Sequence, residues 1–214
     1  MKTPITQQRL RNHLTYSWWK YALLVVLAIF GWNIIYTVTR YRPPEEKRVI
    51  MNLYVVANQP ALNAYMAEIN ETLMPEMEEM CTMYSAPDSM YGDMIFSTHL
   101  AASEGDVYLV NRDYFQRYAS SGPYLPLEDQ TELMAMLEEA GISLSQGWRS
   151  LNEGGERHLF AIPCANLPGM AAYVETPADC YLVVLAGNRN DENVLRFLNI
   201  FVSDLLKPID TPEE

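Results

Sequence analysis

The apolar positions after residue 48 fall into two alternating patterns. In the first, apolar residues follow one another almost without interruption, as in a strand that is buried on both faces of a sheet. This pattern predicts strands at residues 49–56, 80–85, 106–110, 158–163 and 180–187. In the second, apolar residues recur at three- and four-residue steps, as on the buried face of a helix. This pattern predicts helices at residues 60–80, 89–103, 113–118, 133–141 and 191–206.

Local signals predict where these helices begin and end. Pro75 should kink or split the first helix, because proline lacks an N–H and clashes with the preceding turn. Gly105 is placed as a C-terminal stop for the second helix. Asp129 and Glu132 have the spacing of a capping box ahead of the helix at 133–141. Asn190 is placed as the N-cap of the helix at 191–206. The alternation of strand and helix predicts an α/β fold with a single doubly wound, mostly parallel sheet over residues 49–206.

The N-terminal segment has a different pattern. Residues 21–38, from Tyr21 onward, form a run of eighteen residues without charge, which is near the minimum for a membrane-spanning helix. Aromatic residues cluster towards its ends, as they do at membrane interfaces. The run is long for a signal peptide, and Thr39-Arg40-Tyr41-Arg42 offers no small-residue cleavage site. The sequence therefore predicts an uncleaved signal anchor at 21–38, with an N-terminal cytoplasmic segment at 1–20 and a linker at 39–48.

Composition and charge narrow the function. The net charge is −12, but residues 1–48 hold eight of the fifteen basic residues, so the rest of the chain carries −18. A body this acidic repels phosphate backbones, and nucleic-acid binding is not expected. The three histidines and three cysteines show no metal-ligand spacing, and no nucleophile or phosphate-loop motif is present. The sequence therefore predicts no metal, no cofactor and no enzymatic activity.

Three segments, in order, resemble extracellular solute-binding proteins of ABC transporters. AASEGDVYLVNRDYFQRYASSGPYLPLED resembles a family segment in which a helix ends at Gly, a short strand opens with Asp, and the chain leaves through a Gly-x-Leu-x-Pro-Leu-acid turn. The residues that carry this likeness are Ala101, Gly105, Asp106, Gly122, Leu125, Pro126, Leu127 and Asp129. NEGGERHLFAIP resembles the family's glycine turn and strand, and YLVVLAGNRNDENVLRFLNIFV its returning strand and helix, with the pair Phe197-Leu198.

The chain departs from the family where the second lobe should be. Family members have two lobes, and the chain enters the second after the glycine-turn strand. Here only residues 164–179 separate that strand from the next, and sixteen residues cannot make a lobe. The resemblance therefore implies one lobe of a periplasmic-binding-protein-like fold at 49–206. Residues 207–214 are expected to form a flexible tail. The positive charges on the two sides of the span are equal in number, so charge alone does not orient it. Because family members meet solutes outside the cytoplasm, the resemblance implies a membrane-anchored extracytoplasmic body with a cytoplasmic N-terminus.

Cys164 and Cys180 flank this short connection, at the ends of two predicted strands. If the strands are neighbours, a disulfide between the two cysteines is geometrically possible in an oxidising compartment. Two buried thiols are the alternative, because free cysteine is among the most buried residue types.

Candidate ligand-binding residues come from the strand order. In open α/β sheets, ligands bind beyond the carboxyl ends of the strands. The polar residues that follow the predicted strands are Asn58, Gln59, Ser85, Asn111, Arg112 and Asn166. Half a clamp buries only one face of a ligand, which favours an accessory or protein-interaction module whose partner is a protein such as a permease, or a second copy of this chain. The alternative is weak or dimer-dependent binding of a small solute such as a sugar or peptide.

Overall fold

The computed structural model describes residues 7–86, 91–151, 155–187 and 191–207. The chain divides into two compact units, Met1–Arg42 and Pro43–Glu214. The helices are α1 (Gln7–Thr39), α2 (Gln59–Thr72), α3 (Gly92–Ala102), α4 (Arg112–Tyr118), α5 (Thr131–Glu139) and α6 (Asp191–Leu206). The strands are β1 (Arg48–Tyr54), β2 (Glu79–Tyr84), β3 (Val107–Asn111), β4 (Trp148–Ser150), β5 (Arg157–Leu159), β6 (Ile162–Pro163) and β7 (Cys180–Val184).

The first unit is dominated by α1. Within it, Thr15–Thr39 is long and apolar enough to cross a membrane, and an eighteen-residue stretch of it has a mean hydropathy of 2.0 and no buried residue. The predicted span at residues 21–38 lies inside this stretch. A short helical turn at Glu45–Lys47 follows the two prolines of the linker, and β1 begins directly after it.

The second unit is built on a five-stranded sheet in the order β2-β1-β3-β7-β6. β1 pairs in parallel with β2 and β3, whereas β7 is antiparallel to both of its neighbours, β3 and β6. Four of the five strands therefore share one direction, and the predicted mostly parallel sheet is confirmed. The reversal of β7 was not predicted, because strand direction is set by the connection before it and not by the apolar run.

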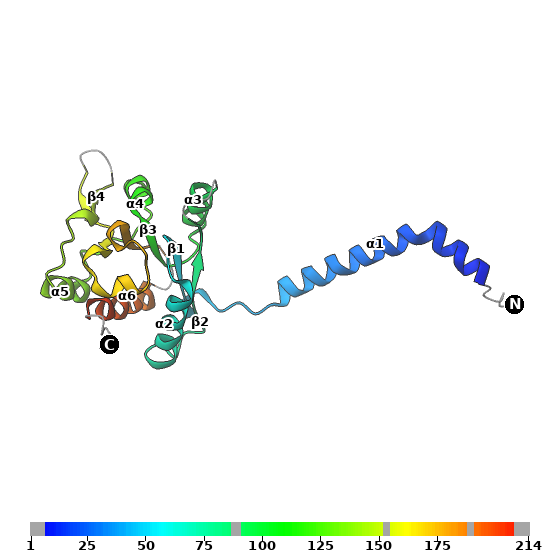
Figure 1. Ribbon diagram of the computed structural model, residues 1–214, viewed down its shortest axis with the longest axis horizontal. Helices are drawn as coiled ribbons and strands as arrows, with labels where there is room; N and C mark the ends of the chain where they lie inside the picture. The colour runs from blue at the N-terminus through cyan, green and yellow to red at the C-terminus, as the bar shows by residue number, and fades with distance from the viewer. Residues whose placement is uncertain (1–6, 87–90, 152–154, 188–190, 208–214) are drawn as a thin grey trace, which may run out of the picture. The chain divides into compact units, whose positions relative to one another are not determined.

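Helices cover both faces of the sheet (Figure 1). Alternate residues of β1 and β3 point to opposite faces, as the two-residue period of a strand requires. Met51, Leu53 and Leu109 join a core with the apolar faces of α2, α5 and α6. Tyr54 and Tyr108 join a second, aromatic core with α3 and α4. The doubly wound arrangement follows from this division of one sheet between two cores.

The first two predicted helices end differently from expectation. Residues 60–80 hold no kinked helix: α2 ends at Thr72, with Leu73 as its C-cap, before Pro75 is reached. The stop of α3 is Ser103, which adopts the left-handed conformation at φ 50°. Gly105 instead lies against Asn52, where a Cβ would come within 2.1 Å of the amide nitrogen of that side chain. Its glycine is therefore needed for the close approach of two segments and does not end the helix.

Two further local predictions are wrong. The N-cap of α5 is Gln130, without a side-chain hydrogen bond, so the Asp129 capping box does not form. Glu132 instead accepts a hydrogen bond from Asn199 of α6, at 3.1 Å. The predicted strand at 158–163 is two strands: β5 pairs with β4 in a separate two-stranded sheet, and β6 joins the main sheet. The predicted cap at Asn190 and nearly all of the predicted tail lie outside the described residues.

Candidate functional site

The carboxyl ends of β1, β2, β3 and β6 and the amino end of β7 meet at one edge of the main sheet, because β7 runs against the others. We call this the strand-end edge. All six of the candidate residues predicted from the sequence lie at or after the carboxyl ends of these strands, with Asn111 the last residue of β3. The edge is therefore the place to examine for binding, as in open α/β sheets generally.

The short connection at residues 164–179 packs on the strand-end edge. It forms three short 3-10 helices, η4 (Cys164–Asn166), η5 (Pro168–Ala172) and η6 (Pro177–Asp179). The backbone N–H of Asn58 donates to the carbonyl of Tyr173 at 2.7 Å, and the N–H of Glu175 donates to the carbonyl of Val56 at 3.1 Å. The backbone after β1 is thus hydrogen-bonded to the protein's own connection.

Arg112 fastens the same connection at a second point. Its Nε lies 3.2 Å from Oδ1 of Asp179, and its guanidinium donates to the carbonyl of Ala178 at 3.3 Å. Both side chains of the ion pair are about half exposed, so the contact contributes little to stability. Its role is geometric, since it fixes η6 beside the end of β3. The candidate ligand residue Arg112 is therefore engaged within the protein.

Asn58 and Asn111 cap helices. The side-chain oxygen of Asn58 accepts from the N–H of Ala61 at 3.2 Å at the start of α2. The oxygen of Asn111 accepts from the N–H of Tyr114 at 2.9 Å at the start of α4. Asparagine is a preferred N-cap because its short side chain reaches the first unpaired N–H groups of a helix. One oxygen of each candidate is committed to the fold.

Gln59 forms a hydrogen bond with the outer strand β2. Its side-chain amide donates to the carbonyl of Thr82 at 3.2 Å. From the next turn of α2, Asn63 accepts from both the N–H and the hydroxyl of Thr82, at 2.9 and 2.8 Å. An edge strand exposes backbone groups that can pair with another chain. These two side chains close the edge of β2 at Thr82, a role that the sequence did not indicate.

Ser85 belongs to a chain of polar groups that sequence reasoning missed. The hydroxyl of Tyr54 lies 2.5 Å from Nδ1 of His99, whose Nε2 lies 3.7 Å from a carboxylate oxygen of Glu104. Burial raises the pKa of Tyr54 to about 12, although a hydrogen bond from Ser85 acts in the opposite direction. The chain links a buried phenol to an exposed carboxylate. His99 follows the buried Phe96 by three residues on α3, and this spacing was the available signal.

The last candidates lie around η4. Asn166 is exposed at the end of this turn. Cys164 and Cys180 are buried, free thiols. Burial raises the pKa of Cys164, and a hydrogen bond with Cys180 raises it further. The two thiols are therefore adjacent, as the sequence suggested, and the structure has them reduced.

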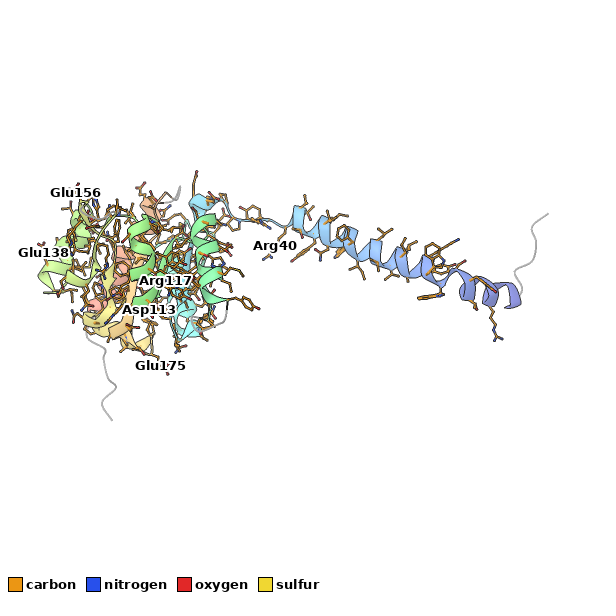
Figure 2. The ribbon with its side chains drawn as sticks, turned by 90° about the horizontal axis from the view of Figure 1, so that it is seen from above. Arg40, Asp113, Arg117, Glu138, Glu156 and Glu175 are labelled. Carbon is orange, nitrogen blue, oxygen red and sulfur yellow. The ribbon has the colours of Figure 1, made fainter. Side chains whose placement is uncertain are left out.

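A shallow hollow of 330 Å³ opens where the connection meets the end of β1. The residues that line it are Val56, Ala57, Asn58, Ala171, Ala172, Tyr173, Val174 and Glu175. Val174 alone among these is buried, and the side chain of Glu175 lies at the outer surface of the body (Figure 2). No group of three or more histidine, cysteine or acidic side chains gathers to hold a metal within the described ranges.

This chain is similar to a solved structure of another protein. No family model matches the sequence, and no curated protein sequence matches it. Among solved structures, the chain is similar to an extracellular solute-binding protein of family 1 from Alicyclobacillus acidocaldarius subsp. acidocaldarius DSM 446, with 19% identity and a TM-score of 0.37. The match covers 59% of this chain and 29% of the other, so this chain spans less than a third of that protein. A TM-score of this size does not establish a shared fold.

Proposed function

We propose that this chain is a membrane-anchored α/β module that acts by contacting another protein and does not trap a solute on its own. The observation that supports this most directly is the connection at residues 164–179. Its backbone bonds to Val56 and Asn58 occupy the end of β1 at the strand-end edge. That edge is where an open α/β sheet offers its ligand site.

The remaining space is poorly suited to tight solute binding. Small-molecule sites usually bury most of the ligand among convergent polar groups and apolar walls. The hollow of 330 Å³ is large enough for a small ligand, but five of its eight lining residues are exposed and only Val174 is buried. Asn58, which lines it, and Arg112, another candidate at the strand-end edge, already bond within the protein. A partner protein needs only an accessible surface and no enclosure.

A solute screen tests this part of the proposal. Purified full-length chain in a non-ionic detergent is heated with sugars, amino acids and short peptides, and the unfolding of the body is followed. A ligand at about 100 times its Kd adds about 2.7 kcal/mol to stability, which raises Tm by roughly 5–10 °C for a domain of this size. We expect no class of solute to reach such a shift. A reproducible shift of several degrees with one class would overturn the proposal.

The proposal places the body outside the cytoplasm, with α1 as a single-pass anchor. The support is the apolar stretch Thr15–Thr39 and the resemblance of the body's sequence to extracellular solute-binding proteins. Fusion of alkaline phosphatase or green fluorescent protein after residue 214 tests the orientation. We expect an active phosphatase and a dark fluorescent protein, because each reporter matures on only one side of the membrane. The reverse result would place the body in the cytoplasm.

The second candidate function is weak binding of a sugar or peptide that needs two copies of the chain. The polar groups of the strand-end edge and the open hollow beside Tyr173 favour it, because a second copy would supply the missing wall. Light scattering after size-exclusion chromatography, with and without the solute panel, separates the two functions. A dimer that forms only with one solute would support this alternative, and a solute-independent mass would count against it.

A further inference from the structure

A second, smaller hollow of 160 Å³ lies beyond Tyr173, between α2, η5 and α6. Tyr65 of α2, Tyr173 after η5 and Asp204 of α6 line it, with Lys207 close by at the end of α6. It shares Ala172 and Tyr173 with the larger hollow, so the two spaces are neighbours. None of its lining residues was among the candidate ligand-binding residues predicted from the sequence.

Aromatic rings form its walls. The rings of Tyr65 and Tyr173 lie 5.9 Å apart at an angle of 57°, and Phe201 lies 5.5 Å from Tyr65 at 50°. Tyr173 and Phe201 are 6.3 Å apart at 51°. Tyr65 and Tyr173 are partly exposed and Phe201 is buried behind them. The three rings are mutually inclined, so they form walls of a hollow and not one flat surface. Ring faces carry negative electrostatic potential and attract cations.

A carboxylate lies among these rings. Asp204 accepts a hydrogen bond from the hydroxyl of Tyr65 at 2.7 Å, and its side chain is 32% exposed. Burial and the negative charges of Asp204 and Glu68 raise the pKa of both Tyr65 and Tyr173. Both phenols therefore stay neutral at physiological pH. The nearby acids Asp204 and Glu68 contribute negative charge. An organic cation is the ligand that this combination favours.

The size of the hollow limits what enters it. Sites for whole small molecules usually occupy about 300–1,000 Å³, whereas this one has room only for the end of a single side chain. The protein's own Lys207 already uses the same chemistry, because its ammonium pairs with the second oxygen of Asp204 from an exposed position. Residues 49–214 carry a net charge of −18, which attracts basic partners.

We propose that the hollow formed by Tyr65, Tyr173 and Asp204 receives the ammonium or guanidinium end of a lysine or arginine from a partner protein. The inference rests on the proposed function, whose partner it describes by chemistry. On binding, the incoming cation displaces Lys207 from Asp204 and lies against the two tyrosine rings. Desolvated cation–aromatic contacts are stronger than exposed ones, so the inclined rings favour this exchange.

The test uses full-length chain in a non-ionic detergent and ligand-observed NMR titration. The probes are N-acetyl-lysine methylamide, N-acetyl-arginine methylamide and the uncharged N-acetyl-norleucine methylamide, which has the lysine stem without its ammonium. We expect the two cations to bind at least about fivefold more tightly than the norleucine compound, as a cation–aromatic contact with a nearby carboxylate predicts. Equal affinity of all three compounds would overturn the inference.

Variants locate the site. Asp204→Asn keeps the shape and an acceptor for Tyr65 but removes the charge, and we expect it to abolish the preference for cations. Lys207→Gln removes the internal competitor, and we expect it to tighten cation binding. Glu138→Gln, an equal charge change at an exposed position of α5, is the matched control and should leave binding unchanged (Figure 2). If Asp204→Asn bound cations as the unaltered chain does, the inference would be wrong.

The outcomes separate this inference from the proposed function. If no cation binds while the solute screen is also negative, the hollow fails as a site and the protein-interaction module stands. If the free lysine compound binds with micromolar affinity, the cation site stands, and the chain captures a solute unaided, contrary to the proposed function. Binding in the millimolar range, restricted to the cations and dependent on Asp204, supports both.

Discussion

The guanidinium of Arg112 lies 3.2 Å from the carboxylate of Asp179, sixty-seven residues further along the chain. This pair joins the start of α4 to η6, and with the backbone bonds at Asn58 and Glu175 it holds the connection on the strand-end edge. The pair is thus one of several contacts that hold the connection on this edge, and both of its side chains are about half exposed.

Removing this pair should loosen the connection without unfolding the body. We expect Arg112→Gln to lower the free energy of unfolding by less than about 1 kcal/mol, as for other exposed ion pairs. Hydrogen exchange at the amide of Glu175 should become faster, because that amide donates to Val56 from the connection. Asp179→Asn removes the other partner and should behave alike. Unchanged exchange at Glu175 in both variants would show that the pair does not hold the connection.

Alanine substitutions at three glycines test how closely neighbouring segments of the backbone pack in this fold. A Cβ at Gly147 would lie 1.9 Å from the carbonyl oxygen of Ala161, and one at Gly169 would lie 2.9 Å from the Cα of Leu205. Alanine at either position must move backbone, so we expect losses of about 1–3 kcal/mol or more, with Gly147 the worse. Gly141 has open space but φ +67°, and Gly141→Ala should cost only about 1 kcal/mol.

Urea unfolding of the three alanine variants, followed by circular dichroism, ranks these losses. The expected order of destabilisation is Gly147→Ala, then Gly169→Ala, then Gly141→Ala. A Gly169→Ala variant as stable as the unaltered protein would mean that η5 does not lie against α6 as described, and the smaller hollow between them would have to be redrawn.

The sequence predicted elements well and their contacts poorly, and the reason is visible in particular residues. The runs at β1, β3 and β7 are apolar on both faces, which is a local signal that survives any arrangement of neighbours. The ends of the helices depended on contacts from elsewhere. Position 105 needs glycine because the side chain of Asn52, fifty-three residues earlier, lies against it. Glu132 accepts a hydrogen bond from Asn199 of α6 instead of capping its own helix.

The candidate site shows the same division. Its position at the carboxyl ends of the strands followed from fold class, and the six candidate residues do lie there. Their hydrogen bonds did not follow, because the partners of Arg112 and Gln59 belong to other elements. The chain Tyr54–His99–Glu104 was missed because its members are forty-five and five residues apart in the sequence and have no motif spacing.

Acid should weaken the contact between Glu128 and the strand β5. Burial alone would raise the pKa of Glu128, but hydrogen bonds from backbone N–H groups, including that of Leu159, and from His158 outweigh it and lower the pKa below 4.5. A carboxyl with a lowered pKa in the folded state stabilises the protein above its unfolded pKa, and this contribution is lost as the pH falls through the folded value.

The matched variant is Glu128→Gln, which keeps the shape without the charge. We expect the difference in unfolding free energy between the unaltered protein and this variant to be constant above about pH 5 and to shrink below pH 4.5. Urea unfolding at several pH values measures it. A difference that does not depend on pH between 3 and 6 would contradict the lowered pKa.

High pH should destabilise the protein through ionisation of the Tyr54 phenol. Burial raises the pKa of its phenol from 10.0 to about 12, so the folded state holds the proton more tightly than the unfolded state does. Stability from this group is complete below pH 10 and is lost as the pH rises towards 12. Tyr54→Phe removes the hydroxyl and should also leave His99 without that partner, at a cost of about 1–2 kcal/mol at neutral pH. A variant as stable as the unaltered protein at pH 7 would show that the bond to His99 contributes nothing.

Thiol counting distinguishes the two forms of the pair Cys164 and Cys180. In the structure both are buried free thiols, whereas Cys81 is only partly buried. Without reductant, we expect the denatured protein to react with three equivalents of a thiol reagent and the native protein to react first at Cys81. Cys81→Ser should remove the early reaction and leave two slow thiols. One reactive thiol in the denatured, unreduced protein would show instead that Cys164 and Cys180 form the disulfide that the sequence also allowed, and that the connection is covalently closed.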